Sequence, residues 1–204
     1  MRDRTIRVLL ALNLLVLTAI LLHQSAIRLQ AAAQSSPNAK NKDNPELVRL
    51  MDEDQADRTP RAGQSIDWKV VGPRDEARLK RVKEIYSQNQ LFTGNDYSNA
   101  ALILQHSNTP EDYLLAHELC VVAISKKGSK ESGIESLAAA SEDRFLMSIG
   151  RPQRFGTQYK SEGPNRPYRL YTVDSGVTDH LRRVMNVPSL LEAKAREAEM
   201  NKER

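Results

Sequence analysis

The sequence has a single cysteine, Cys120, among its 204 residues, and few aromatic side chains. One cysteine excludes a disulfide framework and a cysteine-rich zinc site. With six Tyr, three Phe and one Trp, the core must be built mainly from Leu, Ile, Val and Ala. Nine Gly and nine Pro are too few for a collagen-like or low-complexity chain. We therefore expect one globular domain of about 150 residues, with extra segments.

The sequence also lacks the short motifs that carry common chemistries. It contains no nucleophile elbow, phosphate-binding loop, paired-carboxylate motif or metal-ligand spacing. His117-Glu118 begins like a zinc-protease helix, but Val121 stands where the second histidine would be needed. His117 shares a helical face with apolar residues, which favours a hydrogen-bonded core residue. We expect no cofactor and no metal.

Excess positive charge is confined to the N-terminus. The net charge is +4, yet the first 33 residues hold four of the 30 basic side chains and one of the 26 acidic ones. The rest of the chain is nearly neutral, so it lacks the basic surface typical of nucleic-acid binding. We expect no nucleic-acid partner.

Residues 1–33 have the pattern of a membrane-targeting segment. Three arginines precede an apolar run from Val8 to Leu22, which has the length of a signal-peptide core and is shorter than a typical spanning helix. Two outcomes stay open: a signal peptide cleaved after Ala33, or an uncleaved anchor that contacts the membrane. Either outcome exports the remaining chain, which is then secreted, periplasmic or anchored on the outer side. A buried core helix is disfavoured, because the run offers no polar face.

The remaining sequence predicts a mainly α-helical domain at 45–192, between a polar spacer at 34–44 and a charged, fraying tail at 193–204. Cap residues followed by Pro mark helix starts at Asn44-Pro45 and Thr109-Pro110. We expect helices from 45 to the break before Pro60 and over 73–88, 96–106, 109–126, 130–149, 178–185 and 189–202, with extended segments at 66–71 and 168–173. The helices on either side of Gly128 form a predicted hairpin, and the first of them is apolar on nearly all sides, which favours a central position.

Four groups of polar residues are candidate site residues: Asp54, Gln55 and Arg58 in the first helix, Gln105-His106 at a helix end, Asp143-Arg144 in an Ala-rich helix, and Gln153, Arg154, Thr157 and Gln158 in the irregular 150–158 stretch. Three of these groups also have a structural interpretation. Asp54 and Arg58 are spaced for an i, i+4 ion pair. A histidine is favoured as a cation at a helix C-terminus. The side chains of the irregular stretch can satisfy backbone groups that have no regular ladder.

In their order along the chain, these groups resemble the signature of an uncharacterised bacterial family, one of the domains of unknown function. The pieces are Asp54-Gln55-x-x-Arg58, Gln105-His106, Ala116-His117-Glu118-Leu119, Asp143-Arg144 and Gly150-x-Pro152-Gln153-x-Phe155-Gly156-Thr157-Gln158, closed by Asn186-Val187-Pro188-x-Leu190. The resemblance spans roughly Pro45 to Leu191. It implies that the polar groups belong to one domain to which the membrane segment is an addition, and it implies no reaction.

Three functional hypotheses follow from these patterns. The first, favoured because catalytic motifs are missing, is an exported binding module that contacts a protein or small-molecule ligand through Arg58, Gln105, Arg144, Gln153, Arg154, Thr157 and Gln158. The second is a hydrolase or transferase in which His106 is the acid/base, oriented by Asp143 or Asp54, while Arg144 or Arg154 holds an anionic group. The third is a structural network that pins the 150–158 stretch to the first helix, with function elsewhere.

Overall fold

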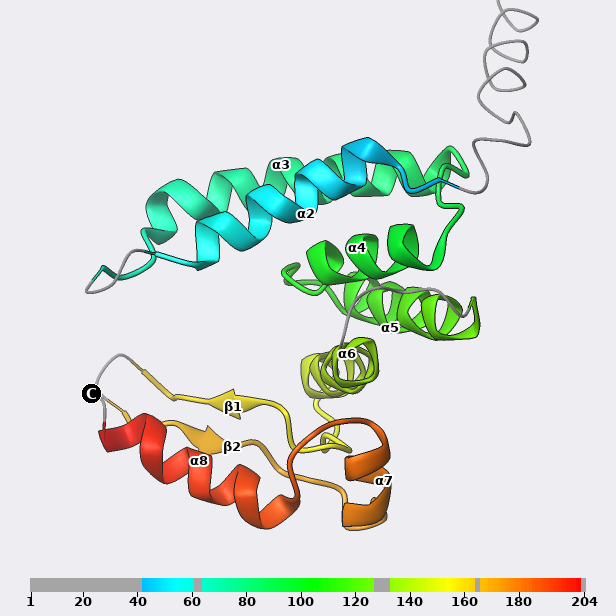
Figure 1. Cartoon of the computed structure of the whole chain (residues 1–204). Helices are drawn as coiled ribbons and strands as arrows, with labels where there is room; N and C mark the ends of the chain where they lie inside the picture. The colour runs from blue at the N-terminus through cyan, green and yellow to red at the C-terminus, as the bar shows by residue number, and fades with distance from the viewer. Residues whose placement is uncertain (1–41, 61–63, 127–132, 164–165, 203–204) are drawn as a thin grey trace, which may run out of the picture. The chain divides into compact units, whose positions relative to one another are not determined.

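The computed structural model describes residues 42–60, 64–126, 133–163 and 166–202. The predicted signal or anchor segment at 1–33 lies outside these residues, as does most of the spacer. Within the described part, no helix is long and apolar enough to cross a membrane. Residues 43–204 form one unit. Its described residues are mainly helical and include a short two-stranded sheet (Figure 1). The predicted helical fold class is confirmed.

Two helices lead the described chain, α2 (Pro45–Arg58) and α3 (Trp68–Ser87). α2 begins as predicted, because the Asn44 side chain accepts a hydrogen bond from the Glu46 N–H and a proline occupies the first turn. The extended segment predicted at 66–71 is wrong. Asp67 caps a helix that already starts at Trp68, and Pro73 lies inside that helix. A proline this early removes one helical hydrogen bond without ending the helix.

α4 (Gly94–Leu104) starts two residues before the predicted position. Thr93 Oγ1 accepts a hydrogen bond from the Asp96 N–H, and the Asp96 carboxylate accepts one from the Thr93 N–H. This capping box makes Gly94 the first helical residue. Asp96 also accepts the Asn44 N–H at 2.6 Å, so one buried carboxylate joins the starts of α2 and α4.

α5 (Pro110–Ser125) confirms the start predicted at Thr109-Pro110, and α6 (Ile134–Ser148) follows it. α5 packs against both α4 and α6, in agreement with the predicted hairpin. Its outer face is nevertheless uncovered within the described residues, because Leu114, Val121 and Ile124 are exposed. The central position predicted for this helix is therefore wrong for one of its faces.

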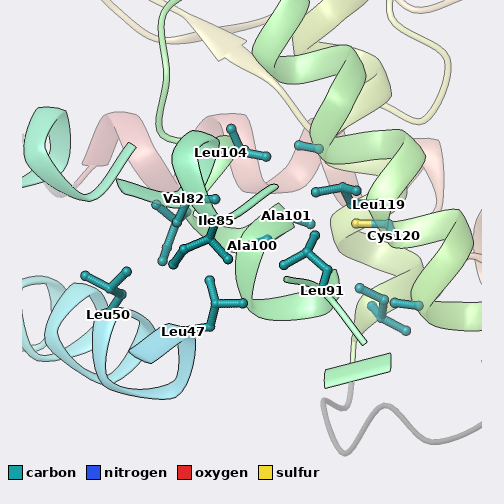
Figure 2. Packing of buried hydrophobic residues seen from close by; sticks show 14 of the residues in the cluster. Leu47, Leu50, Val82, Ile85, Leu91, Ala100, Ala101, Leu104, Leu119 and Cys120 are labelled. Atoms are coloured by element: carbon teal, nitrogen blue, oxygen red, sulfur yellow. The ribbon is translucent and has the colours of Figure 1, made fainter. Parts of the chain in front are cut away.

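The main apolar core joins α2, α3, α4, α5 and the start of α6 (Figure 2). Its buried members are almost all aliphatic, as the composition requires: Leu47, Leu50, Val82, Ile85, Leu91, Ala100, Ala101, Ile103, Leu104, Ala116, Leu119, Cys120, Ala123, Ile134 and Ala138. A smaller cluster contains Ala139, Phe155, Val177 and Val187. Met185 packs against both clusters and so links the C-terminal segments to the helical core.

The C-terminal part contains β1 (Tyr159–Lys160), β2 (Arg169–Leu170), α7 (Asp179–Val184) and α8 (Leu190–Lys202). The strands pair antiparallel, with Tyr159 opposite Leu170. The helix predicted over 189–202 is confirmed as α8, which reaches Lys202 and contains most of the charged tail. Asn201 exchanges hydrogen bonds with the backbone of Tyr168, and Glu197 accepts the Leu170 N–H. These contacts between α8 and the β2 strand hold the charged helix in place.

Candidate functional site

Asp54 on α2 is buried among cationic and amide donors. Its carboxylate accepts hydrogen bonds from the Arg58 guanidinium at 2.8 Å and from the Gln55 amide at 3.0 Å. His106 Nε2 lies 3.3 Å from Asp54 Oδ2, and Arg78 Nε lies 3.7 Å from Asp54 Oδ1. The fold thus brings the Asp54-Gln55-x-x-Arg58 and Gln105-His106 groups together at one carboxylate.

Further ion pairs connect α2 to α3 around this carboxylate. Arg58 binds Asp75 at 2.7 Å. Arg78 binds Asp57 at 2.8 Å and Asp75 at 2.7 Å, while Arg74 binds Asp57 at 2.6 Å. We call these residues together the charge cluster: Asp54, Asp57, Asp75, Arg58, Arg74, Arg78 and His106. Its acids and arginines balance one another, which offsets the cost of removing them from water.

The arginines keep two acids of the charge cluster ionised. Burial acts to raise the pKa of Asp57, but hydrogen bonds from Arg78 and Arg74 outweigh it and lower that pKa below its ordinary value. Burial also acts to raise the pKa of Asp75. Hydrogen bonds from Arg58 and Arg78 outweigh this effect and lower that pKa. The α2–α3 contact therefore depends on carboxylates that stay charged well into acidic solution.

Arg78 is not among the predicted site residues, although its spacing from the apolar residues of α3 indicates that it is buried. It lies four residues before Val82 and seven before Ile85, on the buried face of α3, and is 5% exposed. Tyr86, next to the buried Ile85 in the sequence, is 43% exposed. An arginine at an apolar-face position signals that acids lie opposite, because an unpaired buried charge is costly.

Asp143 on α6 is fully buried and binds the 150–158 stretch, here named the motif loop. Its Oδ1 accepts the backbone N–H groups of Arg154 at 2.6 Å and Phe155 at 2.9 Å. Its Oδ2 accepts the Thr157 N–H at 3.0 Å and the Thr157 hydroxyl at 2.8 Å. All four donors are neutral groups of the motif loop, and they occupy both carboxylate oxygens. Asp54, rather than Asp143, is the carboxylate beside His106.

Two glutamines support the motif loop from inside. Gln153 is fully buried; its Nε2 donates to the carbonyls of Gln158 and Tyr171 at 2.9 Å each, and its Oε1 accepts the Gln158 N–H at 2.8 Å. Gln158 Nε2 donates to Thr157 Oγ1 at 2.9 Å. Both residues were predicted to bind a ligand, yet the hydrogen bonds that they make here are internal to the loop and its neighbours.

Arg182 on α7, which sequence reasoning missed, completes this support. It is 2% exposed, and its guanidinium donates to the carbonyls of Phe155 at 3.3 Å, Arg154 at 3.2 Å and Val177 at 2.7 Å. The sequence indicates its burial only through its position, three residues before Met185, which packs against the smaller apolar cluster. The contacts of Asp143 and Arg182 hold the motif loop against α6 and α7 rather than against the first helix.

The remaining predicted residues lie outside these two networks. The Arg154 side chain is 42% exposed, and its Nε lies 3.4 Å from Glu142. Arg144 Nε is buried without a hydrogen bond, and the Gln105 side chain makes none within the described residues. His117 Nδ1 donates to the Ala138 carbonyl at 3.0 Å, as a core histidine would. The described part of the chain holds no group of three His, Cys, Asp or Glu side chains placed for a metal.

A pocket of about 380 Å³ opens beside the motif loop, and we call it the loop pocket. Its lining comes from α6, the motif loop, β1, the segment before α8, and α8: Ser136, Ala140, Gly156, Thr157, Tyr159, Asn186, Val187, Pro188, Arg196 and Met200. The Gly156-Thr157 and Asn186-Val187-Pro188 motifs meet here. Since Asp143 holds Thr157 by two hydrogen bonds, this wall of the pocket is fixed.

A groove of about 680 Å³ lies between α2 and α3. Its arginines are already paired with acids of the same groove or helix: Arg49 with Glu53, Arg74 and Arg78 with Asp57, and Arg81 with Glu46 and Glu84. Because acids already pair with these arginines, the groove attracts an anionic ligand less strongly than its arginine content suggests.

Comparison of the chain with family models, with curated proteins and with solved structures gave no match. The site is therefore interpreted from its own geometry.

Proposed function

We propose that this chain is an exported or membrane-anchored binding module that holds a ligand in the loop pocket. The observation that carries the proposal is the assembly of this pocket from segments far apart in the sequence, with the wall at Thr157 fixed by Asp143. Binding sites are concave, largely apolar and preformed, with a few polar groups that orient the ligand. Gly156 and Asn186 join Thr157 as lining residues, while Gln153 and Gln158 keep the loop in shape.

Methionine-methyl NMR of the full chain in lipid nanodiscs tests this proposal. Met200 lines the loop pocket and is one of five methionines, so Met200→Leu identifies its signal. We expect members of a small-molecule fragment library to shift the Met200 signal. Ala140→Phe, which fills the pocket, should abolish these shifts. Ala195→Phe, an equal change on exposed α8 surface, should preserve them. A library without effect on Met200 in the folded protein contradicts the proposal.

The exported location rests on the N-terminal sequence pattern and has its own test. Alkaline phosphatase fused after Arg204 is active only when it is carried across the cytoplasmic membrane. We expect activity from the full-length fusion and its loss when residues 2–22 are deleted. An inactive full-length fusion that is stably produced would overturn the exported location and leave the pocket unaffected.

A second candidate, a hydrolase or transferase, is favoured by one specific observation. His106 Nε2 lies 3.3 Å from Asp54 Oδ2 and is buried without a hydrogen-bond partner, so a ring nitrogen next to a carboxylate is left unengaged. We would measure turnover of nitrophenyl ester and phosphate substrates, with His106→Gln compared with His180→Gln on the exposed side of α7. Activity lost only in His106→Gln would support catalysis; turnover that is absent, or equal in both variants, would count against it.

A further inference from the structure

The polar groups that line the loop pocket differ in whether they are already engaged. Ser136 Oγ donates to the Gly133 carbonyl at 2.7 Å, and the Tyr159 hydroxyl donates to the Ala193 carbonyl at 2.8 Å. The Thr157 hydroxyl donates to Asp143. These three hydroxyl groups use their hydrogens within the protein. They shape the pocket, and a ligand must find its donors elsewhere.

Three donor groups of the pocket remain available. The Arg196 guanidinium, the Asn186 side-chain amide and the Gly156 N–H make no hydrogen bond to another described residue. Gly156 is the one residue between Arg154 and Thr157 whose N–H does not bind Asp143. A pocket whose free groups are mainly donors, one of them cationic, is suited to a ligand that accepts hydrogen bonds and carries negative charge.

Arg196 is the charged group among these donors. The acidic residues near it on α8 form no ion pair with it within the described residues. Glu197 binds Arg169 and the Leu170 N–H. Glu192 binds Ser189, and the described structure shows no ion pair between Arg196 and either Glu192 or Glu199. Burial raises the pKa of Tyr159, the positive charge of Arg196 acts to lower it, and the negative charge of Glu197 acts to raise it. Both charges act at this wall of the pocket, but Glu197 is already bound to Arg169.

The rest of the lining is apolar. Ala140, Val187, Pro188 and Met200 provide this surface, and the volume of about 380 Å³ is at the small end of the range for ligand sites. Methionine adapts its shape to irregular apolar partners. The lining therefore suits a short apolar body joined to an anionic head.

We propose that the loop pocket binds a small amphipathic carboxylate, with its head group on Arg196 and Asn186 and its apolar body against Val187 and Met200. This inference rests on the proposed binding function and names the ligand class for the same pocket. A guanidinium and a carboxylate match in geometry and charge. The shared chemistry covers a free short-chain acid and the C-terminal carboxylate of a short apolar peptide.

The test titrates the full chain in nanodiscs with hexanoate and with hexanamide, using the Met200 methyl signal as the readout. A second arm compares an acetylated apolar tripeptide that has a free C-terminus with its amidated form. Arg196→Gln is compared with Lys194→Gln; both side chains are exposed on α8, but Lys194 does not line the loop pocket. We expect the carboxylate form to bind about tenfold or more tightly than the amide, and Arg196→Gln alone to remove this preference.

The arms separate the two proposals and the two ligand sources. Preference for hexanoate, for the free-acid peptide or for both supports the inference, and a preference in one arm alone identifies the source. Equal binding of acid and amide forms at Met200, unchanged by Arg196→Gln, overturns the carboxylate assignment while the proposed binding function stands. If neither these probes nor the fragment library shifts Met200, the proposed function and this inference fail together. A carboxylate preference that Lys194→Gln removes equally would show a general charge effect and would also overturn the assignment.

Discussion

Asp54 and Asp143 are both buried carboxylates of predicted polar motifs, and their surroundings differ in kind. Asp143 is held by three backbone N–H groups and one hydroxyl. Asp54 lies among the Arg58 and Arg78 guanidinium groups, the Gln55 amide and the His106 ring. Backbone donors cannot be exchanged or titrated, so Asp143 has the environment of a fixed structural clasp. Asp54 has partners that substitution and pH can change.

The largest expected effect is that of Asp143→Ala. The change leaves three backbone N–H groups of the motif loop without an acceptor, at about 1–3 kcal/mol for each buried group. We expect the free energy of unfolding to fall by about 3 kcal/mol or more, measured by urea denaturation. Asp52→Ala on the exposed side of α2 is the matched control, with a change below about 0.5 kcal/mol. A loss below about 1 kcal/mol for Asp143→Ala would mean that the clasp does not hold the loop.

The charge cluster should respond to a single substitution with a smaller loss. Arg78→Leu keeps most of the apolar volume but removes the partner that Asp57 and Asp75 share. We expect a loss of about 2 kcal/mol, because Arg58 and Arg74 remain. Arg74→Leu removes a guanidinium from the same Asp57, but Arg74 is 57% exposed, and its loss should cost below about 1 kcal/mol. Equal losses for the two variants would show that burial does not set the strength of these pairs.

Acid should weaken the charge cluster in a defined direction. The pKa values of Asp57 and Asp75 are lowered in the folded chain from an ordinary value of 3.8, against the opposing effect of burial. A lowered folded pKa stabilises the protein above the unfolded value, and this stability is lost as the pH falls through 3.8 toward the folded pKa. Urea denaturation from pH 6 to pH 2.5 should show the loss, and Arg78→Leu should flatten it. Stability that rises over this range would contradict the assignment.

The sequence could predict the elements whose signals are local. Asn44-Pro45 and Thr109-Pro110 mark helix starts because capping depends on residues a few positions apart. The predicted helix over 73–88 starts too late, because Asp67 caps α3 before Pro73. Local cues of this kind compete with one another, and the chain's packing decides between them.

The sequence predicted several residues of the candidate site, but it did not predict which of them contact each other. Asp54 and His106 are 52 positions apart, and periodicity places each on its helix without saying which helices touch. Arg78 and Arg182 were missed because charged residues are expected at the surface, while both are buried against acceptors from other segments. The free donors of the loop pocket follow from what Asp143 and Thr157 already bind, which only the folded arrangement reveals.

The smallest effect belongs to Arg154, and it sharpens the comparison of the two carboxylates. Its backbone N–H binds Asp143, whereas its side chain is 42% exposed and only loosely paired with Glu142 and Asp174. Arg154→Ala keeps the N–H, so we expect urea denaturation to show a change below about 0.5 kcal/mol. Arg154→Pro removes the N–H and should approach the loss seen in Asp143→Ala. Equal losses for the alanine and proline variants would mean that the guanidinium, rather than the backbone, holds this end of the motif loop. Asp143 would then depend on a cation, as Asp54 does.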